Sequence, residues 1–149
     1  MDHPPPTSPP ESIPQPAAAV ALSGWVYLAG SSPSLERQAG IDLLVTRAAG
    51  LFSAEIALGD GDPTNPLLSP LYGNFAGVTT PVYLQVGGAE GLVGENLMIT
   101  EVLARSGVPV RFEAFPEMQH IFQQGAGLVP EADDALGRVG AVLRPLVGL

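Results

Sequence analysis

Residues 81–124 contain most of the information about the fold and have the sequence PVYLQVGGAEGLVGENLMITEVLARSGVPVRFEAFPEMQHIFQQ. Within them, residues 81–87 form an apolar run that breaks at two adjacent glycines, Gly87 and Gly88. An apolar run of this length that ends in turn residues is typical of a buried strand. Glu90 stands in the loop that follows, close to the carboxyl end of the predicted strand.

A helix and a second strand are expected next. Apolar residues recur at helical spacing over residues 97–104, and a Ser-Gly pair follows as a stop signal, which predicts a helix over 94–106. Residues 108–115 then alternate between apolar and polar side chains, as a strand with one buried face does. A strand, a crossover helix and a second strand form a parallel unit. The predicted fold class is therefore α/β, a parallel sheet with flanking helices.

Glu90 follows the first of these strands and His120 follows the second. A crossover connection, which is right-handed, joins strands that run parallel, and parallel strands have their carboxyl ends at the same edge of the sheet. We therefore expect Glu90 and His120 to lie close together although 30 residues separate them. A carboxylate that orients an imidazole is the acid and base pair of a hydrolytic triad, whose third member is a nucleophile. The alternative, for each residue taken alone, is a solvated loop acid and a satisfied loop histidine.

The composition excludes several classes of protein. Six Lys and Arg against 15 Asp and Glu give a formal charge of −9, which argues against nucleic acid or an anionic membrane as partner. The absence of cysteine removes disulfides, thiolate metal sites and a cysteine nucleophile. No apolar run reaches the roughly 18 residues of a membrane span, and the N-terminus lacks the order of a signal peptide. We expect a cytoplasmic protein, and no motif calls for a cofactor or a metal.

The chain is expected to divide into a leader and one domain. Residues 1–16 include seven prolines, which remove amide donors and favour polyproline conformations, so we expect a disordered leader. A proline-rich ligand for an aromatic groove is the alternative for this segment. Residues 17–149 are expected to form one partial α/β domain. In that domain the apolar run over residues 17–28 predicts a further buried parallel strand.

Two further helices are predicted on either side of the central unit. Thr46 is a candidate N-cap for a helix over residues 46–58, and an acidic start and an apolar stripe predict a final helix over 130–146. We expect both helices to turn their apolar side chains towards the core. In the first helix these are Leu51, Ile56 and Leu58, and in the second they are Leu136, Val139, Val142, Leu143 and Leu146.

A long loop is predicted between the first helix and the acid-bearing strand. Residues 59–81 are rich in proline and glycine, so no regular element is expected among them. Asp60 and Asp62 flank a glycine there, an arrangement that suggests either a turn or a calcium site. The turn is favoured, because the further acidic positions of a helix-loop-helix calcium site are absent.

Four local patterns follow one another in the chain. They are Ser23-Gly24-Trp25 at a predicted strand end, DPTNPLLSPL at 62–71, VGGAEGLV at 86–93 and FPEMQHIF at 115–122. In this order and spacing they resemble the C-terminal half of an α/β-hydrolase of the hormone-sensitive-lipase-like esterase family. The resemblance extends from about residue 14 to the end and is clearest from residue 62 onward.

The resemblance implies roles for two residues and the absence of a third. In the family's acid loop the catalytic carboxylate falls on Glu90, and in its histidine loop the general base falls on His120. Gly24 stands where the family often has proline, which is a departure. The chain contains no Gly-x-Ser-x-Gly nucleophile elbow and no His-Gly-Gly oxyanion loop, which precede the acid and the base in the family. The upstream half of the fold is therefore expected to be missing.

Two hypotheses about function follow. The resemblance implies a carboxylic ester hydrolase, esterase- or lipase-like, in a truncated form that is inactive unless an N-terminal-half chain complements it. The second hypothesis is a non-catalytic interaction module whose exposed sheet edge pairs with another chain or with a second copy. Should the chain prove active alone, Ser23, Ser31 and Ser32 are the first serines to test as the nucleophile.

Overall fold

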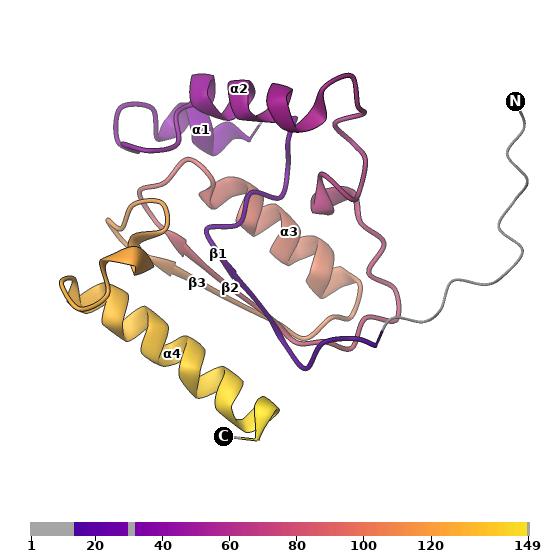
Figure 1. The fold of residues 1–149 in the computed structure, drawn as a ribbon, viewed down its shortest axis with the longest axis vertical. Coiled ribbons are helices and arrows are strands. Elements are labelled where there is room, and N and C mark those ends of the chain that lie inside the picture. The colour runs from indigo at the N-terminus through magenta and orange to yellow at the C-terminus, as the bar shows by residue number, and fades with distance from the viewer. Residues whose placement is uncertain (1–13, 30–31, 149) are drawn as a thin grey trace, which may run out of the picture.

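A computed structural model of the chain describes residues 14–29 and 32–148 (Figure 1). The described residues contain three strands, which form one parallel sheet in the order β1-β2-β3. These strands are β1 (Ala19–Leu22), β2 (Val82–Gly87) and β3 (Val110–Phe115). Val82 of the central strand lies opposite Ala19 on one side and Val110 on the other. The carboxyl ends of all three strands therefore meet at one edge of the sheet, and the predicted parallel α/β architecture is confirmed.

Helices cover both faces of this sheet. In the described residues they are α1 (Pro33–Arg37), α2 (Arg47–Leu58), α3 (Val93–Arg105) and α4 (Pro130–Val147), together with the short 3-10 turns η1 (Pro70–Tyr72) and η2 (Phe122–Gly125). Figure 1 shows α3 and α4 on opposite faces of the sheet, with α1 and α2 on the side of α3. In the part of the chain that the structure describes, none of the helices combines the length and the apolar character needed to cross a membrane.

The side chains of the central strand β2 make contacts on both faces of the sheet. Leu84 belongs to the main apolar cluster, together with Ile99 and Leu103 of α3. The next side chain points to the opposite face, because side chains alternate along a strand. There the amide group of Gln85 donates a hydrogen bond to the carbonyl oxygen of Ala135 in α4. Since helices cover both of its faces, β2 is the most deeply buried of the three strands.

Strand β1 is shorter than the sequence predicts. The apolar run over residues 17–28 gives a strand of only four residues. The reason is Ser23, whose φ of 52° lies in the left-handed region and ends the extended conformation. Trp25 and Tyr27 therefore lie beyond the strand rather than within the sheet.

The predicted helices are present, but the apolar side of α2 is mostly exposed rather than buried. Helix α2 begins after Thr46, whose hydroxyl accepts a hydrogen bond from the Ala49 amide at 3.1 Å, as expected of an N-cap. Its apolar side chains face outward, since Ile56 is 69% exposed. In α4 the fully buried residues are Ala132 and Ala135. Val139, Val142 and Leu143 of the predicted stripe are half-buried and follow these alanines at helical spacing. Leu136 and Leu146, the other two residues of the stripe, are exposed.

The loop regions differ less from expectation. Residues 59–81 contain one short turn, η1, and no strand or α-helix. The five-residue helix α1 was not predicted.

Most of the predicted leader, residues 1–16, lies outside the described residues. At its end, the side-chain oxygen of Gln15 accepts a hydrogen bond from the Thr79 amide at 2.8 Å, which attaches the chain to this loop just before β1.

Candidate active site

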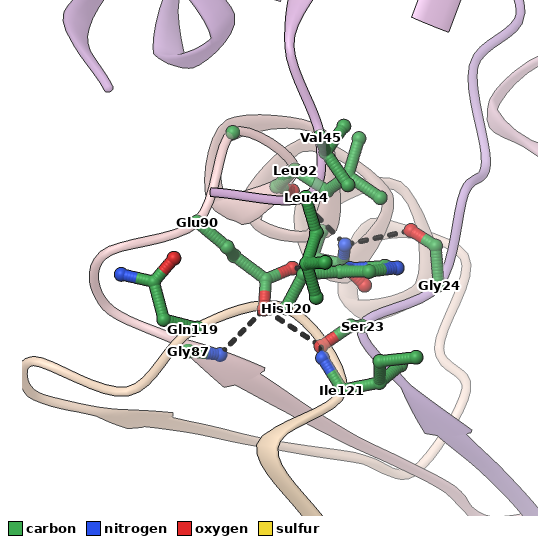
Figure 2. A network of polar contacts seen from close by, with 12 residues as sticks. Ser23, Gly24, Leu44, Val45, Gly87, Glu90, Leu92, Gln119, His120 and Ile121 are labelled. Carbon is green, nitrogen blue, oxygen red and sulfur yellow. Dashed lines mark hydrogen bonds and ion pairs between the residues drawn. The ribbon is translucent and has the colours of Figure 1, made fainter. Parts of the chain in front are cut away.

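Glu90 and His120 meet at the carboxyl edge of the sheet, where the sequence places them. Glu90 lies in the loop between β2 and α3, and His120 lies in the loop after β3. The distance between His120 Nδ1 and Glu90 Oε1 is 3.6 Å (Figure 2). The side chain of Glu90 is fully buried and that of His120 is 18% exposed. The separation slightly exceeds the length of a hydrogen bond.

The histidine loop packs directly on the end of β2. The Gly88 amide donates to the Phe115 carbonyl at 2.7 Å, and the Ala89 amide donates to the Met118 carbonyl at 3.0 Å. A methyl group at Gly87 would lie 2.2 Å from the Met118 carbonyl oxygen, so a larger residue would force the two loops apart. These contacts hold the histidine loop against the acid loop.

The carboxylate of Glu90 is bonded through one oxygen only. Its Oε2 accepts hydrogen bonds from the Ser23 hydroxyl at 2.6 Å and from the Gly87 amide at 2.8 Å. Its Oε1 is buried without a hydrogen-bond partner, and so is His120 Nδ1. The two unpartnered atoms face each other, because Oε1 is the carboxylate atom that approaches the imidazole. This arrangement is suited to orienting the ring of His120.

The serines named from the sequence are not placed as free nucleophiles. The hydroxyl of Ser23 points to Glu90 rather than into open space. Ser32 is buried, and its hydroxyl shares a hydrogen bond of 2.8 Å with that of Ser34. Ser31 lies outside the described residues. Sequence reasoning did not foresee the contact between Ser23 and Glu90, although the position of Ser23 at a strand end was a usable signal.

A second buried carboxylate, Glu95, was missed by sequence reasoning. It lies in the first turn of α3 and is fully buried. Its Oε1 accepts a hydrogen bond from the Val26 amide at 2.7 Å, while its Oε2 has no partner. Burial raises the pKa of Glu95 to about 7; the bonds from the backbone oppose this rise and the nearby Glu90 adds to it. Nothing in the local sequence distinguishes Glu95 from an exposed acid in the first turn of a helix.

A cavity of about 190 Å³ opens beside His120. Its lining consists of Trp25, Leu44, Val45, Ala49, Gly50, Ser53, Leu92 and His120. The lining includes no Asp, Glu, Lys or Arg among the described residues. Because Nδ1 is buried towards Glu90, the exposed part of the imidazole faces this cavity. A larger cavity of about 260 Å³ lies at the opposite edge of the sheet and contains neither Glu90 nor His120, so we assign no chemistry to it.

The aspartates of the long loop form a turn. Asp62 Oδ1 accepts hydrogen bonds from the amide and the hydroxyl of Thr64, at 2.8 and 2.7 Å. These bonds lower the pKa of Asp62. Within residues 14–29 and 32–148, no group of three or more acidic, histidine or cysteine side chains is arranged to hold a metal ion.

Comparison with known proteins extends these observations. A family model described as alpha/beta hydrolase fold matches residues 8–124. An acetyl-hydrolase of Streptomyces hygroscopicus is 35% identical over 135 residues, which cover 91% of this chain and 45% of that protein. Esterase LipU of Mycobacterium tuberculosis is 30% identical over 146 residues, which cover 90% of this chain and 47% of that protein.

Solved structures of esterases are also similar to this chain. A crystal structure of an esterase from the bacterial hormone-sensitive lipase family superimposes with a TM-score of 0.88 at 33% identity, over 91% of this chain and 46% of that one. The chain thus spans a little under half the length of the relatives that it matches. The matched residues include both the acid loop and the histidine loop. The chain belongs to the α/β-hydrolase family, in the group of hormone-sensitive-lipase-like esterases.

Proposed function

We propose that this chain supplies the acid and the general base of a carboxylic ester hydrolase. Glu90 orients the imidazole through Nδ1, and His120 takes the proton of a serine hydroxyl and then delivers it to the leaving alcohol. The main support is the approach, at 3.6 Å, of two buried atoms without other partners, Glu90 Oε1 and His120 Nδ1. A solvated loop acid and an unrelated histidine would not leave two such atoms facing each other.

A small, uncharged carboxylic ester is the proposed substrate. Apart from Ser53 and His120, the cavity beside His120 is lined by apolar side chains and a glycine, and a charged group would lose its hydration there without gaining an ionic partner. The name of the Streptomyces hygroscopicus relative, an acetyl-hydrolase, agrees with a short acyl group.

The serine nucleophile and the oxyanion donors are proposed to come from a polypeptide segment outside the 149 residues. The sequence contains no Gly-x-Ser-x-Gly, and the relatives extend over about twice the matched length. Among the described residues, β1 has a hydrogen-bonded neighbour on one side only, so its other edge is available to a further strand. Without such a segment, the chain should release no product from aryl esters above background, because His120 alone has only water to activate.

A fusion protein provides the test. Residues 14–149 are joined to the N-terminal segment of the Streptomyces hygroscopicus acetyl-hydrolase that the match leaves uncovered, and hydrolysis of p-nitrophenyl acetate is measured. We expect activity in the fusion and a loss of about 10³-fold or more in kcat with His120→Ala. Glu90→Gln should lower kcat by about 10² to 10⁴-fold, because the amide cannot stabilise the imidazolium that forms.

The control for these variants is Glu117→Gln, which changes an exposed carboxylate in the same histidine loop and should leave kcat unchanged. Ser53→Ala removes the serine that lines the cavity and should also be tolerated. A fusion that stays fully active with His120→Ala would refute the proposed function. Activity in the unfused chain that depends on Ser53 would instead place the nucleophile inside the 149 residues.

A non-catalytic interaction module is the second candidate function. The observation in its favour is the open edge of β1, which a strand from another chain or a second copy could extend. In that case the fusion should be inactive, and the unfused chain should associate through β1 whether or not His120 and Glu90 are intact. An active fusion that loses its activity with His120→Ala or with Glu90→Gln would support the hydrolase and contradict the interaction module.

A further inference from the structure

Ser23 is a buried residue in a strained conformation, and the roles proposed so far do not use it. It is 3% exposed and has a φ of 52°. Among the described residues other than glycine, only Glu117 and Ile121 also have a positive φ. Ser23 and Ile121 are in direct contact, because the Ile121 amide donates a hydrogen bond to the Ser23 hydroxyl at 3.1 Å. A left-handed conformation is costly for both residues, so their contact is maintained against strain.

The Ser23 hydroxyl joins two loops that are far apart in the sequence. It donates to Glu90 Oε2 in the acid loop at 2.6 Å and accepts from the amide next to His120 at 3.1 Å (Figure 2). A hydroxyl can donate and accept at the same time, which neither Ala nor Gly can do. The bond to Glu90 is assisted by the charge of the carboxylate and is therefore stronger than one between neutral groups.

The position of Ser23 also decides which oxygen of Glu90 faces the imidazole. Ser23 and the Gly87 amide both donate to Oε2, and this leaves Oε1 towards His120 Nδ1. Without the hydroxyl, one donor remains at Oε2 and the Ile121 amide loses its acceptor. The carboxylate could then rotate, and the histidine loop would lose its direct attachment to the strand end.

We propose that Ser23 is a positioning residue of the Glu90–His120 pair: its hydroxyl fixes both the rotation of the carboxylate and the place of the histidine loop. This inference rests on the proposed function of that pair. Ser23 touches neither the ester nor the nucleophile and acts through Glu90 and through the backbone beside His120.

The test uses the full 149-residue chain with isotope-labelled histidine. The parent chain and all its variants carry His3→Gln, which leaves His120 as the single histidine of the sequence, so every histidine signal comes from it. The measured quantity is the proton signal of the His120 Nδ1–H, whose low-field position reports how closely the Glu90 carboxylate approaches this atom. We expect Ser23→Ala and Ser23→Gly to abolish this signal or to move it clearly upfield. Glycine adopts a positive φ without strain, so Ser23→Gly removes the hydroxyl without adding strain to the backbone.

Ser69 provides a matched control. Its hydroxyl also donates at 2.6 Å, to the Pro63 carbonyl, and accepts at 3.1 Å, from the Leu28 amide, and it is fully buried. Ser69→Ala therefore removes an equivalent pair of hydrogen bonds away from the carboxylate, and the His120 signal should stay in place. In the active fusion, Ser23→Gly should lower kcat by about tenfold or more with KM unchanged, since a bond to a charged group is lost.

The outcomes separate this inference from the function on which it rests. A signal that is lost with Glu90→Gln but unchanged with Ser23→Gly overturns the role of Ser23 alone. A signal that is absent from the parent chain, or that survives Glu90→Gln, overturns both the pairing of Glu90 with His120 and the role of Ser23. Equal loss with Ser69→Ala and Ser23→Gly would reveal a general structural effect and also overturns the inference.

Discussion

Glu95 has a local environment that costs stability at neutral pH. It is fully buried, and the structure places no basic side chain in an ion pair with it among the described residues. Burial raises its pKa from 4.5 to about 7. The folded protein therefore keeps a proton that the unfolded chain releases between these values. The contribution of Glu95 to the free energy of unfolding of the protein is therefore largest below pH 4.5. It falls as the pH rises from 4.5 to about 7.

We predict that Glu95→Gln removes this pH dependence. The amide is neutral at every pH and its oxygen can still accept the bond from the Val26 amide. At pH 8 the variant should be more stable than the parent chain, by of the order of 3 kcal/mol at most, and the difference should shrink towards pH 5. Urea denaturation at pH 5, 6, 7 and 8 measures the effect.

Glu101→Gln is the control for this experiment. Glu101 also lies in α3 but is exposed, and it forms an ion pair with Arg105 on the surface. Its replacement should change stability little and without a trend over the same pH range. An unchanged slope in the Glu95→Gln variant would show that another group causes the pH dependence.

The attachment of α1 to the start of α3 depends on a glycine. The Ser34 hydroxyl accepts a hydrogen bond from the Gly94 amide at 3.0 Å and donates to the Gly91 carbonyl. A methyl group at Gly94 would lie 2.6 Å from the hydroxyl oxygens of Ser32 and Ser34. The two elements can therefore approach each other only because residue 94 lacks a side chain.

We predict that Gly94→Ala destabilises the protein by about 1 to 3 kcal/mol, because it forces α1 away from α3. Gly137→Ala is the opposite case, since this exposed glycine in α4 has no atom within 4 Å of the added methyl group. The second variant should be more stable by about 0.5 to 1 kcal/mol through helix propensity alone. Chemical denaturation compares the two, and a stabilising Gly94→Ala would contradict the packing described above.

Apolar side chains on one side of the molecule are exposed to solvent. On α2, Phe52 is 64% and Ile56 is 69% exposed, and their spacing of four residues places them on one helix face. Leu43, in the segment before this helix, is 79% exposed. Exposed apolar side chains favour association, whereas the formal charge of −9 opposes it by repulsion between copies.

We predict concentration-dependent self-association that increases with salt, because salt screens the repulsion. The double variant Phe52→Lys with Ile56→Lys should reduce both the association, measured by sedimentation velocity, and the binding of an apolar dye. The control is Leu128→Lys, which changes a leucine that is 90% exposed but remote from α2 in the sequence, and it should have a smaller effect. A parent chain that remains monomeric at high concentration and high salt would contradict the prediction.

The sheet and its helices could be predicted from sequence because their signals are local. Alternation over residues 108–115 and helical spacing over 94–106 depend on near neighbours in the chain, and the structure confirms both within two residues. The proximity of Glu90 and His120 could also be predicted, because neighbouring parallel strands have their carboxyl ends at the same edge of the sheet. The buried face of α2 could not, because burial depends on which partner covers a helix.

The sequence by itself therefore determined the order of the elements, the parallel sheet and the edge at which the acid and the histidine meet. Only the tertiary structure decided what holds them there. The bond between Ser23 and Glu90 joins residues 67 positions apart, which only the folding of the complete chain brings together. The burial of Glu95 arises in the same way. Periodicity in a sequence reflects contacts between residues that are near neighbours in the chain. Hydrogen bonds between loops depend instead on the packing of the whole chain.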